Sequence, residues 1–125
     1  MKNFIFLFLT FISVQVVGQD NNEPASSLKN NEIGQFASFF NKTIDLNIPS
    51  AKANYSDKQA KILVQNFFKE VNMKSYTTQH KGGGNERPYY EIGKLETEKG
   101  NYRTYLLFQK SKETIKIIEF RIEQE

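Results

Sequence analysis

The centre of the chain carries the residues that could do chemistry. His80 is the single histidine, and imidazole is the side chain whose ordinary pKa lies nearest neutrality. Strand alternation places Tyr76 and Thr78 on the face of His80, so a phenol, a hydroxyl and an imidazole could contact one ligand. A glutamate of the following strand, Glu91 or Glu96, could complete a pair that transfers a proton.

The two glutamates differ in strand parity. Glu91 shares its face with Gly93, whereas Glu96 shares its face with Tyr90, and the sequence leaves open which face points inward. We favour a structural interpretation of His80, in which it holds the loop at residues 82–84 or is solvated. The sequence therefore predicts no catalytic set, and His80 with Glu91 or Glu96 is the alternative.

Tyrosines gather in the same region. Five of the six lie between Tyr76 and Tyr105. A tyrosine has a large apolar area and a polar tip, which suits a ligand pocket, a subunit interface or an ordinary strand, and the sequence leaves these three roles open. If the face lines a pocket, we expect the ligand to contact Tyr76, His80, Tyr90 and Tyr105.

Cofactor and metal sites are not expected. Gly82-Gly83-Gly84 is followed by a tyrosine-rich strand rather than by a helix, so it lacks the context of a phosphate-binding loop. Lys81 and Arg87 flank these glycines, which leaves an anion contact as an alternative. One histidine, no cysteine and dispersed carboxylates provide no cluster of metal ligands.

Helical patterns occupy the first half of the mature chain. Apolar residues from Leu28 to Phe40 recur at helical spacing, which predicts a helix or a helical pair ending near Asn41, interrupted at Gly34. Ser56-Asp57-Lys58-Gln59 has the form of a capping box and predicts the start of a longer helix that continues to Val71. Its apolar stripe is expected to pack in the core.

Strand patterns dominate the second half. Residues 44–48 alternate and predict an edge strand, and residues 50–55 predict a turn. Four further segments predict an antiparallel meander: 75–81, 89–97, 102–110 and 114–123. In the last segment the apolar positions change phase between Ile117 and Ile118, which predicts a β-bulge. The expected architecture is α+β, with helices on one face of a curved sheet of four to five strands.

The first 18 residues have the pattern of an export signal. A short basic start precedes an uncharged apolar run at residues 4–17, which is too short to span a bilayer. We expect cleavage after Gly18, a polar leader at residues 19–27 and one domain at residues 28–125, with no membrane span after cleavage. The net charge of the chain is +3 before cleavage. Its basic residues are scattered along the sequence, which argues against a nucleic-acid partner.

The order of motifs resembles a known family. The sequence contains FASFFN (Phe36–Asn41), YSDKQA (Tyr55–Ala60), HKGGG (His80–Gly84), YEIGKLET (Tyr90–Thr97) and FRIE (Phe120–Glu123). Together with IDLNI at residues 44–48 and NFFKE at residues 66–70, these resemble domain of unknown function 4783, a family of short exported bacterial proteins. The resemblance implies a cystatin-like, nuclear-transport-factor-2-like cone, often with a pocket between sheet and helix and often dimeric through the sheet. It implies no activity.

The expected function combines these observations. We expect an exported, periplasmic or secreted, non-enzymatic module that binds a small apolar or amphipathic ligand or a partner protein, and that forms a homodimer through the sheet. One alternative is a cone-pocket enzyme of the isomerase or dehydratase kind that uses His80 with a glutamate. Another is a structural envelope protein.

Overall fold

A computed structural model of the protein describes residues 23–84 and 87–125. The expected export signal at residues 1–18, and the first part of the expected leader, lie outside the described residues. Within the described part of the chain, no helix is both long enough and apolar enough to cross a membrane.

Two short helices open the fold, as the expected helical pair. They are α1 (Pro24–Lys29) and α2 (Ile33–Ala37). The break falls at residues 30–32, where Asn31 has a positive φ of 58°, and not at Gly34, which lies inside α2. Helix α1 begins within the segment expected to be a polar leader, and Ser27 is buried there. The packed domain therefore starts by Pro24 rather than at Leu28.

The long helix α3 (Asp57–Val71) follows its predicted pattern. The Gln59 amide donates to Ser56 Oγ at 3.2 Å, so Ser56 is the predicted N-cap. The helix ends at Asn72, which adopts the left-handed conformation. Its buried residues form the predicted apolar stripe: Ala60, Val64, Phe67, Phe68 and Val71.

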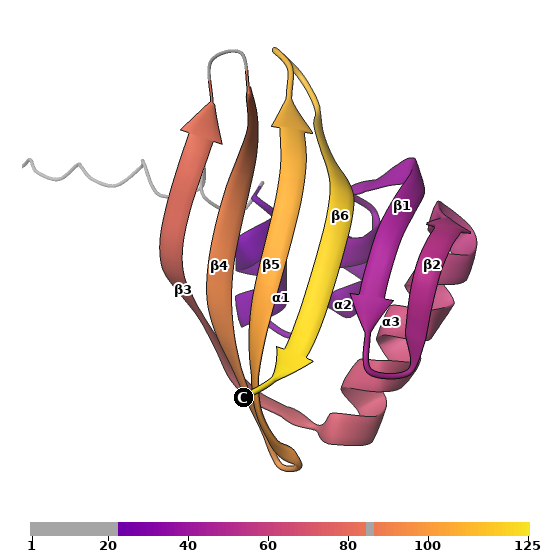
Figure 1. The fold of residues 1–125 in the computed structure, drawn as a ribbon, viewed down its shortest axis with the longest axis vertical. Helices are drawn as coiled ribbons and strands as arrows, with labels where there is room; N and C mark the ends of the chain where they lie inside the picture. The colour runs from indigo at the N-terminus through magenta and orange to yellow at the C-terminus, as the bar shows by residue number, and fades with distance from the viewer. Residues whose placement is uncertain (1–22, 85–86) are drawn as a thin grey trace, which may run out of the picture.

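Six strands form one mixed sheet, in the order β2-β1-β6-β5-β4-β3 (Figure 1). Strands β3 to β6 are the predicted antiparallel meander, whereas β1 pairs in parallel with β6. The bounds are β1 (Phe40–Ile48), β2 (Ala51–Ser56), β3 (Met73–Gly84), β4 (Arg87–Thr97), β5 (Gly100–Lys110) and β6 (Ile115–Gln124).

The strand count and the position of β1 differ from expectation. The predicted four to five strands become six because β2 replaces the predicted turn, and β1 is therefore an interior strand rather than an edge. Strand β2 is exposed at Lys52, Ala53 and Asn54. A strand at the sheet edge that buries so little needs no apolar alternation, so the sequence pattern did not reveal it.

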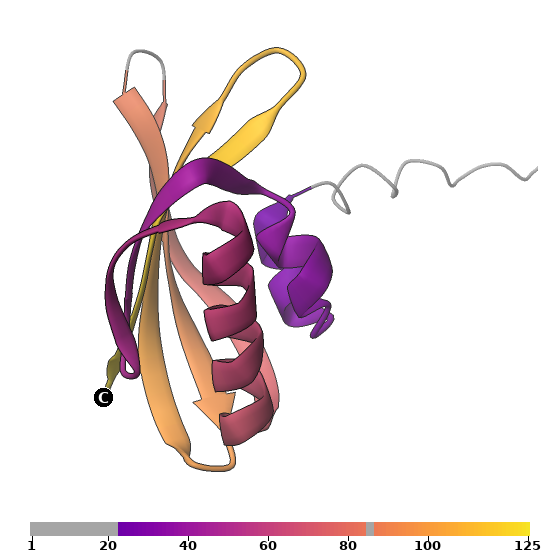
Figure 2. The same ribbon diagram turned by 90° about the vertical axis from the view of Figure 1, so that its right-hand side faces the viewer.

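The three helices cover one face of the sheet, which curves around α3 (Figure 2). The core lies between these layers, where Phe36 of α2 contacts Phe120 of β6 with ring centroids 5.0 Å apart. The predicted bulge in β6 is confirmed, because Leu107 pairs with Glu119 while Phe108 pairs with Ile117. The extra residue is Ile118, and its insertion lets Ile117 and Phe120 share the core face.

Candidate functional site

A buried polar cluster lies on the inner face of the sheet, the face that carries the helices. Tyr76, Glu91 and Thr104 are at most 4% exposed, and Thr78 is half-buried beside them. Thr104 Oγ1 donates to the Tyr76 hydroxyl, and Thr78 Oγ1 donates to Glu91 Oε1, each at 3.5 Å. Three strands thus bring a phenol, two hydroxyls and a carboxyl together inside the cone.

Burial controls the ionisation of this cluster. Loss of water raises the pKa of Tyr76 to about 12, so its phenol stays a hydrogen-bond donor. Burial also raises the pKa of the Glu91 carboxyl above its usual range, although Lys81 acts in the opposite direction. A buried carboxyl with a raised pKa is a common feature of binding and catalytic sites.

The β4 sequence places Glu91 inward. Glu91, Gly93 and Leu95 are all buried on the same side of the strand, so Glu91, rather than Glu96, points toward the core. Gly93 makes room for the ring of Tyr76, because a Cβ at that position would lie 2.4 Å from the Tyr76 hydroxyl oxygen. Glu96 points to the other face, where it accepts a hydrogen bond from Ser75 Oγ at 2.8 Å.

A pocket opens beside Glu91 at one end of the inner face. Its volume is about 250 Å³, and its lining includes Lys81, Tyr89, Phe108 and Lys110 in addition to Glu91. The Tyr89 and Phe108 rings stack with centroids 5.8 Å apart. Lys110 Nζ lies 4.9 Å from the Tyr89 ring centroid and 3.6 Å from Glu23 Oε2. The pocket therefore combines an aromatic wall, a buried carboxyl and a charged rim.

His80 lies on the opposite, outer face, so the prediction that it shares a face with Tyr76 and Thr78 is wrong. Thr78 pairs with Gly93 but His80 pairs with Ile92, and the extra residue Gln79 reverses the alternation. The His80 side chain is exposed, and its Nε2 lies 3.1 Å from the Tyr90 hydroxyl. The structure therefore does not bring His80 together with Glu91.

The outer face carries a row of stacked side chains across four strands, which we call the outer ladder: His80, Tyr90, Tyr105 and Arg121. Tyr90 and Tyr105 stack with centroids 6.3 Å apart, and the Arg121 guanidinium lies 4.9 Å from the Tyr105 centroid. Arg121 Nε also donates to Glu119 at 2.7 Å. Tyr76 is thus separated by the sheet from His80, Tyr90 and Tyr105, and these four predicted ligand contacts do not form one site.

Sequence reasoning missed the wall and rim of the inner pocket. The sequence does not single out Tyr89, Phe108 and Lys110. Each lies in a strand, and which alternate side chains of a strand point toward the core depends on the strands paired with it. Gly93 was the available signal, since a glycine inside a strand often marks a close approach by another group. Across residues 23–84 and 87–125, no three His, Asp or Glu side chains gather closely enough to hold a metal ion.

Comparisons with known proteins identify the relatives of this chain. Residues 21–123 match the family described as Domain of unknown function (DUF4783). A crystal structure of a DUF4783 family protein from Bacteroides uniformis is 23% identical, with a TM-score of 0.73, and the match covers 81% of this chain and 93% of that one. No curated protein matches the sequence.

More distant structures share the fold. An NTF-2 like protein of unknown function from Burkholderia xenovorans is 5% identical, with a TM-score of 0.60 over 82% of this chain and 77% of that one. A cystatin-like domain of unknown function from Nostoc punctiforme is 13% identical, with a TM-score of 0.61 over 81% and 70%. The predicted α+β fold of the cystatin-like, nuclear-transport-factor-2-like class is thereby confirmed.

Proposed function

Since this chain belongs to the DUF4783 family, whose description assigns no activity, we propose from its geometry that it is a non-enzymatic module that binds a small amphipathic ligand in the inner pocket. We further propose that the protein is exported, to the periplasm or out of the cell. The export proposal is supported by the basic start and the apolar run of residues 4–17.

The buried Glu91 carboxyl beside stacked aromatic rings carries the binding proposal. Ligand pockets typically combine apolar walls with a few placed polar groups that orient the ligand. Tyr89 and Phe108 supply the apolar wall, and Glu91 supplies a polar group that is itself only 3% exposed. A ligand with an aromatic or apolar body and one hydrogen-bonding end would match this arrangement.

Nuclear magnetic resonance titration tests the proposal with three probes that differ only at the polar end: 2-phenylethylamine, 2-phenylethanol and 3-phenylpropionate. We expect at least one probe to shift the amide signals of Tyr89, Glu91 and Phe108. Tyr89→Ala should abolish the shifts, because it removes the wall, whereas Tyr105→Ala removes a tyrosine of the outer face and should preserve them. The proposal fails if no probe shifts these signals, or if both variants respond alike.

The enzyme alternative that uses His80 with a glutamate has less support. His80 and Glu91 lie on opposite faces of the sheet, and Glu96 is hydrogen-bonded to Ser75. Proton transfer needs acid and base groups within hydrogen-bond reach of one substrate. No specific observation favours the alternative of a structural envelope protein.

A second candidate function is self-association through the outer face. Tyrosine and arginine are enriched at the centres of protein interfaces, and the outer ladder presents Tyr90, Tyr105 and Arg121 together. We propose that this face forms the homodimer. Light scattering on the mature protein should give twice the monomer mass, and Tyr105→Ala should lower it. A monomer at every concentration tested would contradict this proposal.

A further inference from the structure

The two hairpins of the meander separate at one end and leave a fork between them. Strands β4 and β5 pair from Thr97 with Gly100 up to Tyr89 with Phe108. Strand β4 continues beyond this point with β3 alone, and β5 continues with β6 as far as the pairing of Lys110 with Ile115. Figure 2 shows the hairpins diverging at this end.

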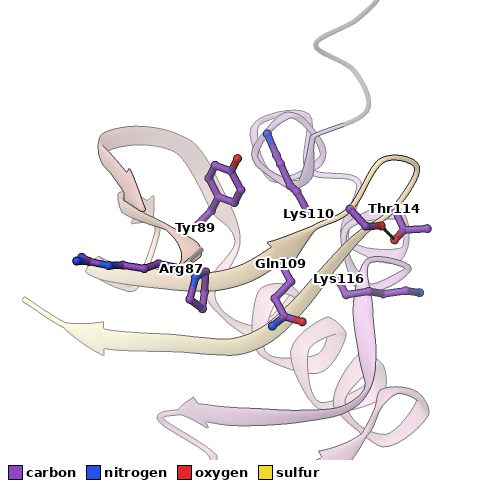
Figure 3. A pocket seen from close by; sticks show the side chains of 8 residues that line it. Arg87, Tyr89, Gln109, Lys110, Thr114 and Lys116 are labelled. Atoms are coloured by element: carbon purple, nitrogen blue, oxygen red, sulfur yellow. Dashed lines mark hydrogen bonds between the residues drawn. The ribbon is translucent and has the colours of Figure 1, made fainter. Parts of the chain in front are cut away.

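A pocket of about 360 Å³ occupies the fork. Figure 3 shows Tyr89 and Lys110 rising on one side of the strands and Gln109 pointing to the other. Arg87 and Lys116 lie at opposite ends of the pocket in this view. The pocket therefore lies between the two hairpins, and its lining side chains point to both faces of the sheet.

The lining of the fork is cationic. Arg87, Lys110 and Lys116 come from three successive strands, and none of the described residues that line the pocket carries a carboxylate. Among the described residues, the nearby acids are Glu23, which pairs with Lys110, Glu91 of the adjoining inner pocket, and Glu113 of the following loop, which neighbours Lys112. Gln109 pairs with Lys116 and Lys110 pairs with Ile115, so Lys110 and Lys116 lie on opposite faces of the β5–β6 hairpin, while Arg87 lies on the other hairpin of the fork. Their charged ends point in different directions, which suits an extended anion better than a compact one.

The polar groups of the fork distinguish among polyanions. Gln109, Ser111 and Thr114 offer amide and hydroxyl groups to a hydroxyl-rich chain. Tyr89 is the one aromatic side chain among the described residues that line the fork, whereas sites for single-stranded nucleic acids stack successive bases on several aromatic rings. We propose that the fork binds an acidic polysaccharide, through Arg87, Lys110 and Lys116 and through these hydrogen-bonding side chains. The fork adjoins the inner pocket, and the two share Tyr89 and Lys110.

Calorimetric titration of the mature protein at low salt tests this proposal. The probes are an oligogalacturonate, which carries carboxylates, and a heparin oligosaccharide, which carries sulfates. Neutral dextran oligosaccharide and oligothymidylate serve as comparisons. We expect the acidic oligosaccharides to bind, with affinity that falls as salt screens the exposed charges. The relative strength of the two acidic probes identifies whether the fork prefers carboxylate or sulfate.

A double variant and a matched control assign the binding to the fork. Arg87→Gln with Lys116→Gln removes two cations of the fork, and we expect binding to weaken about tenfold, or about 1.4 kcal/mol. Lys74→Gln with Lys99→Gln removes the same charge at the other end of the sheet and should weaken it far less. Three results would overturn the proposal: no binding of either acidic oligosaccharide, equal loss in both double variants, or equally tight binding of oligothymidylate.

Discussion

Two strand glycines lie equally close to tyrosine rings, but only one of these rings is held in the core. A Cβ at Gly93 would lie 2.4 Å from the Tyr76 hydroxyl oxygen and 2.6 Å from its Cζ. A Cβ at Gly82 would lie 2.4 Å from the same atoms of Tyr90. Tyr76 is 4% exposed and cannot move away, whereas Tyr90 is half-exposed on the outer face. We predict that Gly93→Ala destabilises the fold and that Gly82→Ala is tolerated.

The expected magnitude follows from two opposing effects. Forcing an extra methyl group into a packed core costs about 1–3 kcal/mol. Alanine recovers about 0.5–1 kcal/mol, because glycine loses more backbone freedom on folding. The two ranges leave a fall of at most about 2.5 kcal/mol in the free energy of unfolding of Gly93→Ala, and their midpoints give about 1.3 kcal/mol. For a domain of this size, the midpoint lowers the melting temperature by roughly 5–10 °C. Gly82→Ala should stay within about 1 kcal/mol of the parent, because Tyr90 is half-exposed and its ring can turn away from the sheet, losing only its surface contacts with His80 and Tyr105.

Thermal and urea unfolding, followed by circular dichroism on the mature protein, measure both effects. Adding Gly93→Ala to a Tyr76→Leu variant provides the control, since removal of the ring should abolish most of the penalty. The reasoning is refuted if Gly93→Ala is as stable as the parent. It is also refuted if Gly82→Ala loses as much stability as Gly93→Ala, because the mobility of the neighbouring ring would then be irrelevant.

Two further predictions concern a buried carboxyl and a helix cap. Because burial raises the pKa of Glu91, the folded protein holds a proton that the unfolded chain releases, so stability falls as pH rises from the ordinary glutamate range through the raised pKa. Glu91→Gln should remove this fall, and urea unfolding between about pH 4 and pH 8 should show the variant gaining on the parent; a constant difference would contradict the expectation. Ser56→Ala removes the acceptor of the Gln59 amide and should cost about 1 kcal/mol, whereas an unchanged urea midpoint would argue against the cap.

Local sequence patterns predicted most of the elements. The capping box at Ser56 and the apolar stripe that follows it gave α3 nearly to the residue. The phase change at Ile118 gave the bulge in β6, because that interruption is visible within one strand. The meander of β3 to β6 followed from its alternating segments and turns.

The parts of the fold that the sequence did not predict depend on segments that are distant in the sequence. Strand β2 is polar and exposed, so it has no apolar signature of its own, and it becomes a strand because β1 offers it a partner. The parallel pairing of β1 with β6 joins segments about 75 residues apart in the sequence, as in the pairing of Leu46 with Phe120, and no local pattern encodes it. The start of the domain at Pro24 was hidden for a related reason, since the burial of Ser27 depends on the packing of α1.

The sequence by itself determined which segments alternate, where α3 begins, and that His80, Tyr76 and the two glutamates lie in neighbouring strands. Only the tertiary structure decided which of them share a face. Strand alternation has a period of two, so the single extra residue Gln79 moved His80 to the outer face while Tyr76 stayed inside. Unlike the bulge in β6, this bulge has no phase change of apolar residues within its own strand, and it shows only in the pairing of β3 with β4. The sequence drew attention to His80, but the pocket that we propose as the binding site contains Glu91 and the aromatic wall beside it.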